Sequence, residues 1–188
     1  SIDRNIQAMV EQKLAAQVQA VRAKSGSVVI MDPSNGAIRA MATYPSFDPG
    51  NYSAVKDYNV FLNQAVDSQF EPGSGMKAFT VAAGLDQGKI TPDSTYDDPG
   101  CYKIDTYNVC NAVGDKVGRG KTMTVVLRDS LNTGVMHILR LLGGNPQKFT
   151  LGGKKMLYDY LTKHFGFGQR TGIEQANEAS GVLNAPSN

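Results

Sequence analysis

Residues 70–80 read Phe-Glu-Pro-Gly-Ser-Gly-Met-Lys-Ala-Phe-Thr. The Pro-Gly pair at 72–73 interrupts the chain, and the apolar residues after it recur at helical spacing. The pattern predicts a helix that begins near Ser74 and ends near Gly88. Because residues three apart lie on one face of a helix, we expect the Ser74 hydroxyl and the Lys77 amine to lie one turn apart on the same face.

These two side chains have the chemistry of an activated nucleophile. A serine hydroxyl attacks poorly until a neighbouring group removes its proton, and a lysine does so only when its ammonium is desolvated or crowded by other cations. The helix N-terminus adds partial positive charge and free N–H groups that stabilise an oxyanion. The structural alternative is that Ser74 only caps the helix, since Ser-x-x-Lys also arises by chance.

A second pattern, Ser130-Leu131-Asn132, falls at the junction of two helical patterns. A second hydroxyl there is suited to relay a proton between Lys77 and a leaving group. The Asn amide is suited to hold Lys77 or a substrate amide in place. The structural alternative is that Ser130 and Asn132 only form the turn between the helices, because Ser and Asn are common where helices break.

The N-terminal region predicts a helix followed by a hairpin. Apolar residues at helical spacing predict a helix over 3–22, capped by Ser1 or Asp3. Two apolar runs, 27–31 and 37–43, flank a turn rich in Asp, Pro, Asn and Gly, which predicts a β-hairpin.

The rest of the chain predicts helices and loops but no further strand. The predicted loops are 44–60, 91–120 and the tail from 166, and the predicted helices are 122–131, 135–142 and 154–165. A hairpin of two strands is marginally stable by itself. Either helices cover it, or further strands of its sheet come from sequence outside this chain.

The composition is that of an ordinary globular protein and excludes several function classes. The chain has 188 residues, of which 41% are hydrophobic and 19% charged, with a formal net charge of +2. Dispersed charges give no case for a nucleic acid partner or a basic membrane-binding face. No apolar stretch approaches the roughly 18–20 residues of a membrane span. The chain opens on Ser1 without a Met or a signal peptide, so we expect it to be part of a longer protein.

The cysteines and histidines do not predict a metal centre. Cys101 and Cys110 lie in a turn-rich stretch, His137 and His164 lie far apart in the sequence, and no spacing among the four matches a zinc site. The two cysteines are either a short-loop disulfide, which implies an exported protein, or two independent thiols. The spacing alone leaves both open.

Residues 70–80 and Ser130-Leu131-Asn132, in this order, resemble the active-site region of penicillin-binding proteins, most closely the class B, monofunctional D,D-transpeptidases. The likeness covers nearly the whole chain. Its other segments are Ser1–Gln7, Ser25–Pro33, Gly36–Ala42, Tyr44–Pro49, Phe165–Gly168, Thr171–Ile173 and Glu178–Gly181. The resemblance implies one transpeptidase domain over residues 1–188. Its expected fold is α+β, an α/β sandwich type shared with serine β-lactamases, with helices packed on an antiparallel sheet and later strands missing from this chain.

The same resemblance implies a role for each motif residue. Ser74 would be the nucleophile that attacks a D-Ala-D-Ala stem peptide or a β-lactam, and its backbone N–H would supply half of an oxyanion hole. Lys77 would be the general base and Ser130 a proton shuttle, while Asn132 would contact Lys77 and the substrate amide. The family has Thr-Phe or similar where this chain has Gly75-Met76, which leaves these roles intact. No metal or cofactor is implied.

A third family motif, Lys-Thr-Gly or Lys-Ser-Gly on a later strand, is expected to lie beyond Asn188. Lys24-Ser25-Gly26 has the right letters but precedes Ser74, and Arg170-Thr171-Gly172 has no strand pattern around it. Losing one oxyanion donor typically costs about 10²–10³ in rate. We therefore expect this chain alone to be acylated poorly by β-lactams.

The resemblance also implies a location and partners. The parent protein would act outside the cytoplasmic membrane, held by an anchor absent here, and would work with a membrane glycosyltransferase. That location favours the Cys101–Cys110 disulfide. The alternatives are a β-lactam sensor or serine β-lactamase-like domain, for which no water-activating residue is obvious, and a non-catalytic binding domain that retains the fold.

Overall fold

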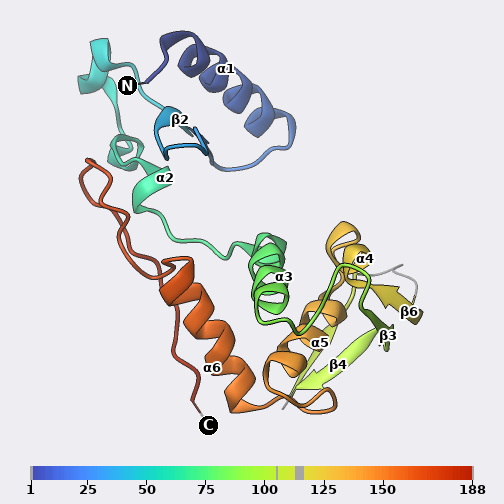
Figure 1. Cartoon of the computed structure of the whole chain (residues 1–188). Helices are drawn as coiled ribbons and strands as arrows, with labels where there is room; N and C mark the ends of the chain where they lie inside the picture. The colour runs from blue at the N-terminus through green and yellow to red at the C-terminus, as the bar shows by residue number, and fades with distance from the viewer. Residues whose placement is uncertain (1, 105, 113–116, 188) are drawn as a thin grey trace. The chain divides into compact units, whose positions relative to one another are not determined.

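A computed structural model describes residues 2–104, 106–112 and 117–187 (Figure 1). The chain divides into two compact units, the first formed by Ser1–Gln69 with Gly172–Ala179 and the second by Phe70–Thr171 with Ser180–Asn188. The expectation of one transpeptidase domain over residues 1–188 stays a prediction.

The first unit is built on a helix that packs against a hairpin. Helix α1 (Arg4–Ala20) is capped by Asp3, whose carboxylate accepts from the backbone N–H groups of the first turn. Strands β1 (Gly26–Met31) and β2 (Ile38–Tyr44) pair antiparallel. The buried residues of this core are Val10, Leu14 and Val18 of the helix and Ala40 and Ala42 of β2. The predicted helix and hairpin are therefore confirmed, with the helix covering one face of the hairpin.

Short helical turns complete the first unit. The predicted loop over 44–60 contains the 3₁₀ helix η1 (Pro49–Ala54), and η2 (Tyr58–Phe61) and the single turn α2 (Gln64–Asp67) follow. Each begins at an Asp or Asn whose side chain accepts from the backbone, which is the usual reason these residues start turns.

The second unit is a helical cluster centred on α5 (Asn132–Leu142). Its other helices are the 3₁₀ turn η3 (Gly73–Gly75), α3 (Met76–Asp86), α4 (Met123–Arg128), α6 (Leu151–Asp159) and the π-helical turn η4 (Tyr160–His164). Helix α5 packs against α3, α4 and α6. The buried core residues are Val81, Ala83, Ile90, Tyr96, Met123, Val126, Ile138, Leu142 and Tyr160.

The prediction that residues 91–120 are loop is wrong. Strand β3 (Thr95–Asp98) pairs antiparallel with β6 (Gly118–Thr122), and β4 (Cys101–Ile104) pairs antiparallel with β5 (Tyr107–Cys110). Each strand has only four or five residues, too few for apolar alternation to stand out. Strands β3 and β6 pair across the intervening β4–β5 hairpin, and the described residues contain six strands where the pattern predicts two.

Two glycines let α5 approach its neighbours closely. A Cβ at Gly134 would lie 2.3 Å from Cγ2 of Val126, a fully buried residue of α4. A Cβ at Gly84 of α3 would lie 2.8 Å from Cγ2 of Ile138 on α5. Both distances are far below van der Waals contact, so any larger residue forces these helices apart.

We expect Gly134→Ala to destabilise the protein by about 1–3 kcal/mol, because the added methyl group has no space beside Val126. Gly152→Ala is the matched control, since Gly152 is exposed in α6 and a Cβ there would make only an ordinary contact. It should stabilise by up to about 1 kcal/mol through helix propensity. Urea unfolding followed by circular dichroism measures both, and a neutral Gly134→Ala would contradict the packing argument.

Candidate active site

Ser74 lies in η3, directly before α3, and is exposed. The N-cap residue of α3 is Gly75, and neither η3 nor α3 begins with a side-chain capping hydrogen bond. The helix ends at Asp86, and Gly88 follows with a φ of 59°, as the sequence predicts. Ser74 is therefore at a helix start without serving as its cap, which removes the simplest structural explanation of this residue.

Lys77 is buried in the first turn of α3, with 8% of its surface exposed. Its Nζ donates to Oγ of Ser130 over 2.8 Å and also to the backbone carbonyl of Ser130. A lysine amine removed from water requires acceptors for its N–H groups, and Ser130 supplies two of them. The structure thus brings together two residues that are 53 positions apart in the sequence.

Ser130 has a left-handed backbone, with a φ of 56°. Its N–H donates to Leu127 O over 3.3 Å, and the N–H of Leu131 donates to Val126 O over 2.9 Å. This pair of bonds is a Schellman motif, in which the left-handed position is usually glycine. Ser130 therefore carries a strained backbone that gives both of its oxygens to Lys77.

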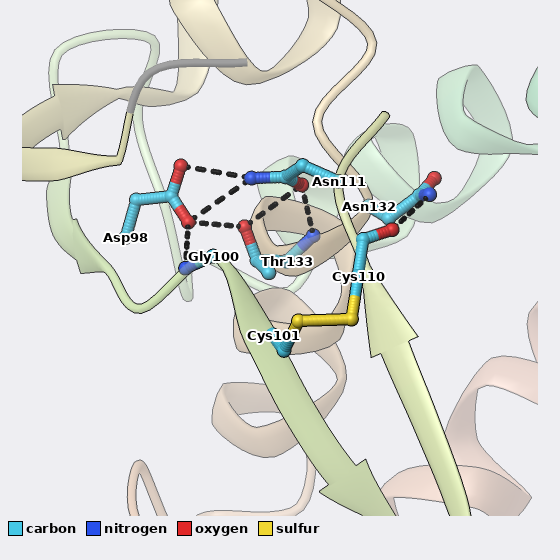
Figure 2. The surroundings of a disulfide bond; sticks show 7 residues. All are labelled: Asp98, Gly100, Cys101, Cys110, Asn111, Asn132 and Thr133. Atoms are coloured by element: carbon cyan, nitrogen blue, oxygen red, sulfur yellow. Dashed lines mark hydrogen bonds between the residues drawn. A yellow bond between two sulfur atoms is a disulfide. The ribbon is translucent and has the colours of Figure 1, made fainter. Parts of the chain in front are cut away.

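Asn132 is the first residue of α5, and its Nδ2 donates to Cys110 O over 2.7 Å (Figure 2). The helix break predicted between 122–131 and 135–142 is confirmed, although α4 already ends at Arg128. Contacts of Asn132 with Lys77 and with a substrate amide stay predictions.

Cys101 and Cys110 face each other across the β4–β5 pair and form a disulfide with an S–S distance of 2.06 Å. Of the two alternatives that the spacing leaves open, a disulfide or two independent thiols, the structure shows the disulfide. Figure 2 shows the bridge beside the start of α5, where Asn132 and Thr133 lie. The bridge joins the strand that contacts Asn132 to its neighbour.

Sequence reasoning missed Asp98, whose side chain is fully buried at the end of β3. Its carboxylate accepts from Gly100 N over 2.8 Å, from Thr133 Oγ1 over 2.7 Å and from Asn111 Nδ2 over 2.9 and 3.1 Å. It also forms an ion pair with Lys121 over 3.3 Å. The Asp-Pro-Gly sequence at 98–100 looks like an ordinary turn, so no local signal marks the carboxylate as buried.

Two opposing effects act on the pKa of the Asp98 carboxyl. Burial raises it and is the largest single influence. Hydrogen bonds from Gly100 and Thr133, with the charge of Lys121, together outweigh burial and hold the pKa below its ordinary value. Asp98 is therefore ionised in the folded protein over the whole neutral range.

Tyr96 adds a hydroxyl to the same cluster. Its OH lies 3.0 Å from Thr133 Oγ1. Because Thr133 gives its own proton to Asp98, Tyr96 is the donor in this pair. Burial raises the pKa of Tyr96 to about 12, which keeps this donor protonated.

The other predicted features fall outside this site. Gly26 of Lys24-Ser25-Gly26 begins β1, and Arg170-Thr171-Gly172 forms no strand. Within residues 2–104, 106–112 and 117–187, no three His, Cys, Asp or Glu side chains are grouped so that they could hold a metal ion. In that same part of the chain no helix has the length and apolar character to cross a membrane.

A protein-family match and similar curated proteins identify the same family for this chain. Residues 26–188 match the family described as penicillin binding protein transpeptidase domain. Stage V sporulation protein D of Bacillus subtilis is 33% identical over 187 residues, and the peptidoglycan D,D-transpeptidase FtsI of Escherichia coli is 30% identical over 184. Each match covers 97% of this chain.

The fold of this chain is also similar to solved structures of penicillin-binding proteins. The crystal structure of penicillin binding protein 3 from Mycobacterium tuberculosis superposes with a TM-score of 0.85 at 28% identity, covering 97% of this chain and 38% of that one. The predicted α+β transpeptidase fold is confirmed by this likeness. The chain spans 27% of the Bacillus subtilis protein and 28% of the Escherichia coli protein, so it corresponds to about a quarter of each.

We expect the unfolding free energy of the protein to fall in acid more steeply than that of Asp98→Asn. A carboxyl whose pKa is lower in the folded than in the unfolded chain stabilises fully above the unfolded value of about 3.9. That stabilisation is lost as the pH falls through the folded pKa. Asp98→Asn should therefore be less stable than the parent at pH 7, and the difference should shrink below about pH 4. Urea titrations from pH 7 to pH 2 measure it, and a constant offset would show that ionisation of Asp98 does not matter.

Proposed function

The chain belongs to the transpeptidase domain family of class B penicillin-binding proteins, and we propose from this premise that Ser74 is the nucleophile of a peptidoglycan D,D-transpeptidase. The observation that carries the proposal is the hydrogen bond from buried Lys77 to Ser130. It joins the two motifs, and Ser74 stands three residues before Lys77 at the start of the same helix.

In the proposed acylation step, Lys77 acts as a neutral amine and takes the proton of the Ser74 hydroxyl while Oγ attacks the carbonyl carbon between the two D-alanines. The new C–O bond converts the carbonyl to an oxyanion, which the Ser74 N–H at the helix start stabilises. As the oxyanion collapses, the peptide C–N bond breaks and the amine of the terminal D-alanine leaves with a proton. The amine of a second stem peptide then attacks the ester carbonyl, the bond from that carbon to Oγ of Ser74 breaks, and the proton lost by the amine returns to Ser74.

Ser130 is placed to carry the proton to the leaving amine. Its Oγ accepts from Lys77 Nζ over 2.8 Å, which leaves its own O–H proton available to a substrate nitrogen. A positioned hydroxyl of this kind contributes through general acid catalysis, typically worth about 10²–10⁴ in rate. Asn132, two residues later at the start of α5, would hold the substrate amide.

The family supplies the expected substrates and setting. The substrate is the D-Ala-D-Ala end of a peptidoglycan stem peptide, and β-lactams acylate the same serine. The parent protein acts outside the cytoplasmic membrane, anchored to it, beside a membrane glycosyltransferase. The Cys101–Cys110 disulfide supports that location, since disulfides persist in oxidising compartments.

Two other functions use the same fold. A serine β-lactamase would hydrolyse the acyl-enzyme, whereas a transpeptidase or a β-lactam sensor keeps a stable adduct. A non-catalytic domain would form no adduct, and substitution of Ser74 would change nothing.

We expect a fluorescent penicillin to label the gene product that carries these residues once per chain, on the peptide containing Ser74. Ser74→Ala should abolish the label, and Lys77→Ala should slow labelling by about 10²–10⁴ because the base is lost. Ser53→Ala, an exposed serine of the first unit, is the control and should label normally. Gel fluorescence and mass spectrometry measure this, and labelling that survives Ser74→Ala would refute the assignment.

Replacing Ser130 by Gly and by Ala separates its hydroxyl from its backbone. Both variants lose Oγ, but only glycine adopts the left-handed conformation without strain, so Ser130→Gly should be about 1–2 kcal/mol more stable than Ser130→Ala. We expect penicillin acylation to slow by about 10²-fold or more and by the same factor in both. If the more stable Ser130→Gly were acylated faster than Ser130→Ala, the result would show that Ser130 has only a structural role.

A further inference from the structure

Helix α5 begins without a cap of its own. Its N-cap residue is Leu131, which has no side chain able to accept a hydrogen bond. The missing acceptor comes from another segment, since Oδ1 of Asn111 accepts from Thr133 N over 3.0 Å. This bond does the work of an N-cap across 22 residues of sequence.

The same two segments are joined by a second bond in register with the first. Cys110 O accepts from Nδ2 of Asn132 over 2.7 Å, one residue before the bond between Asn111 and Thr133. Two consecutive residues at the end of β5 thus bind two consecutive residues at the start of α5 (Figure 2). We call the bonds between residues 110–111 and 132–133 the α5 clamp.

Asp98 fixes the orientation of the α5 clamp. Both of its carboxylate oxygens accept from Nδ2 of Asn111, at 2.9 and 3.1 Å, so the amide of Asn111 cannot rotate without losing these bonds. Oδ1 of Asp98 also accepts from Thr133 Oγ1 over 2.7 Å. A carboxylate offers only acceptors, and the backbone of Gly100, the side chains of Asn111 and Thr133, and the Lys121 amine all present donors to it.

We propose that Asp98 and Asn111 are positioning residues for Asn132, which they hold in the orientation that binds substrate. The proposal deepens the proposed function and rests on it, because it assigns the supporting residues of the Ser130-Leu131-Asn132 motif. Asp98 touches no reacting atom; it acts through Asn111 and Thr133 on the start of α5, and Cys110 O then fixes the Asn132 amide.

Asp98→Asn tests the role of the carboxylate with little change in volume. The variant replaces one acceptor oxygen by an NH₂ group, which would face donors of Asn111, Thr133 or Gly100. The α5 clamp then loses the group that sets its orientation. Asp97→Asn is the matched control, because Asp97 is the preceding residue of β3 and is exposed.

The decisive experiment is a double-mutant cycle on penicillin acylation in the full gene product. We expect Asp98→Asn to lower the second-order acylation constant about tenfold in the parent and by less than about twofold in Asn132→Ala, because its effect passes through Asn132. Asp97→Asn should leave the constant unchanged in both backgrounds. An equal loss in both backgrounds, or no loss in the parent, would overturn the proposal.

A second measurement does not depend on acylation. The side-chain amide signals of Asn132 and the backbone signal of Thr133, assigned by NMR, should shift in Asp98→Asn, and the Thr133 N–H should exchange faster with solvent. In Asp97→Asn, the Asn132 and Thr133 signals and the exchange rate of the Thr133 N–H should be unchanged. If the parent is not acylated, the proposed function fails, and these signals alone decide whether Asp98 positions Asn132. Unchanged signals would overturn the positioning role.

Discussion

The burial of the Lys77 amine is the constraint around which the second unit is organised. A lysine with 8% of its surface exposed needs hydrogen-bond acceptors, and Ser130 offers both its hydroxyl and its carbonyl. This requires the turn between α4 and α5 to stay against the first turn of α3. The left-handed backbone of Ser130 is the local cost of presenting two oxygens from one residue to one donor.

That contact is possible only because the helices approach closely. Gly134 allows α5 to lie against Val126 of α4, and Gly84 allows α3 to lie against Ile138 of α5. Neither glycine has a positive φ, so their role is space and not backbone freedom. The distance between α3 and the α4–α5 turn is therefore set by packing in the core.

The site residues could be found from the sequence more easily than the structure that supports them. Ser74, Lys77 and the Ser130-x-Asn132 pattern are short motifs with fixed spacing, and the hairpin and helices have clear periodicity. Strands β3 to β6 have no such pattern, because each has only four or five residues and β3 pairs with β6 across the β4–β5 hairpin. Asp98 could not be found for the same reason, since its burial depends on Asn111 and Thr133.

The absence of a cap on α5 follows from the motif itself. The turn residue Ser130, whose hydroxyl binds Lys77, lies one residue before the N-cap position of α5, which Leu131 occupies. Leu131 must be apolar, because it is buried at the position of the Schellman motif that packs back on its helix. A helix that starts at Asn132 under these conditions has to obtain its acceptor from elsewhere. The β4–β5 pair supplies it through Asn111, which makes the strands that sequence analysis missed a necessary part of the motif's geometry.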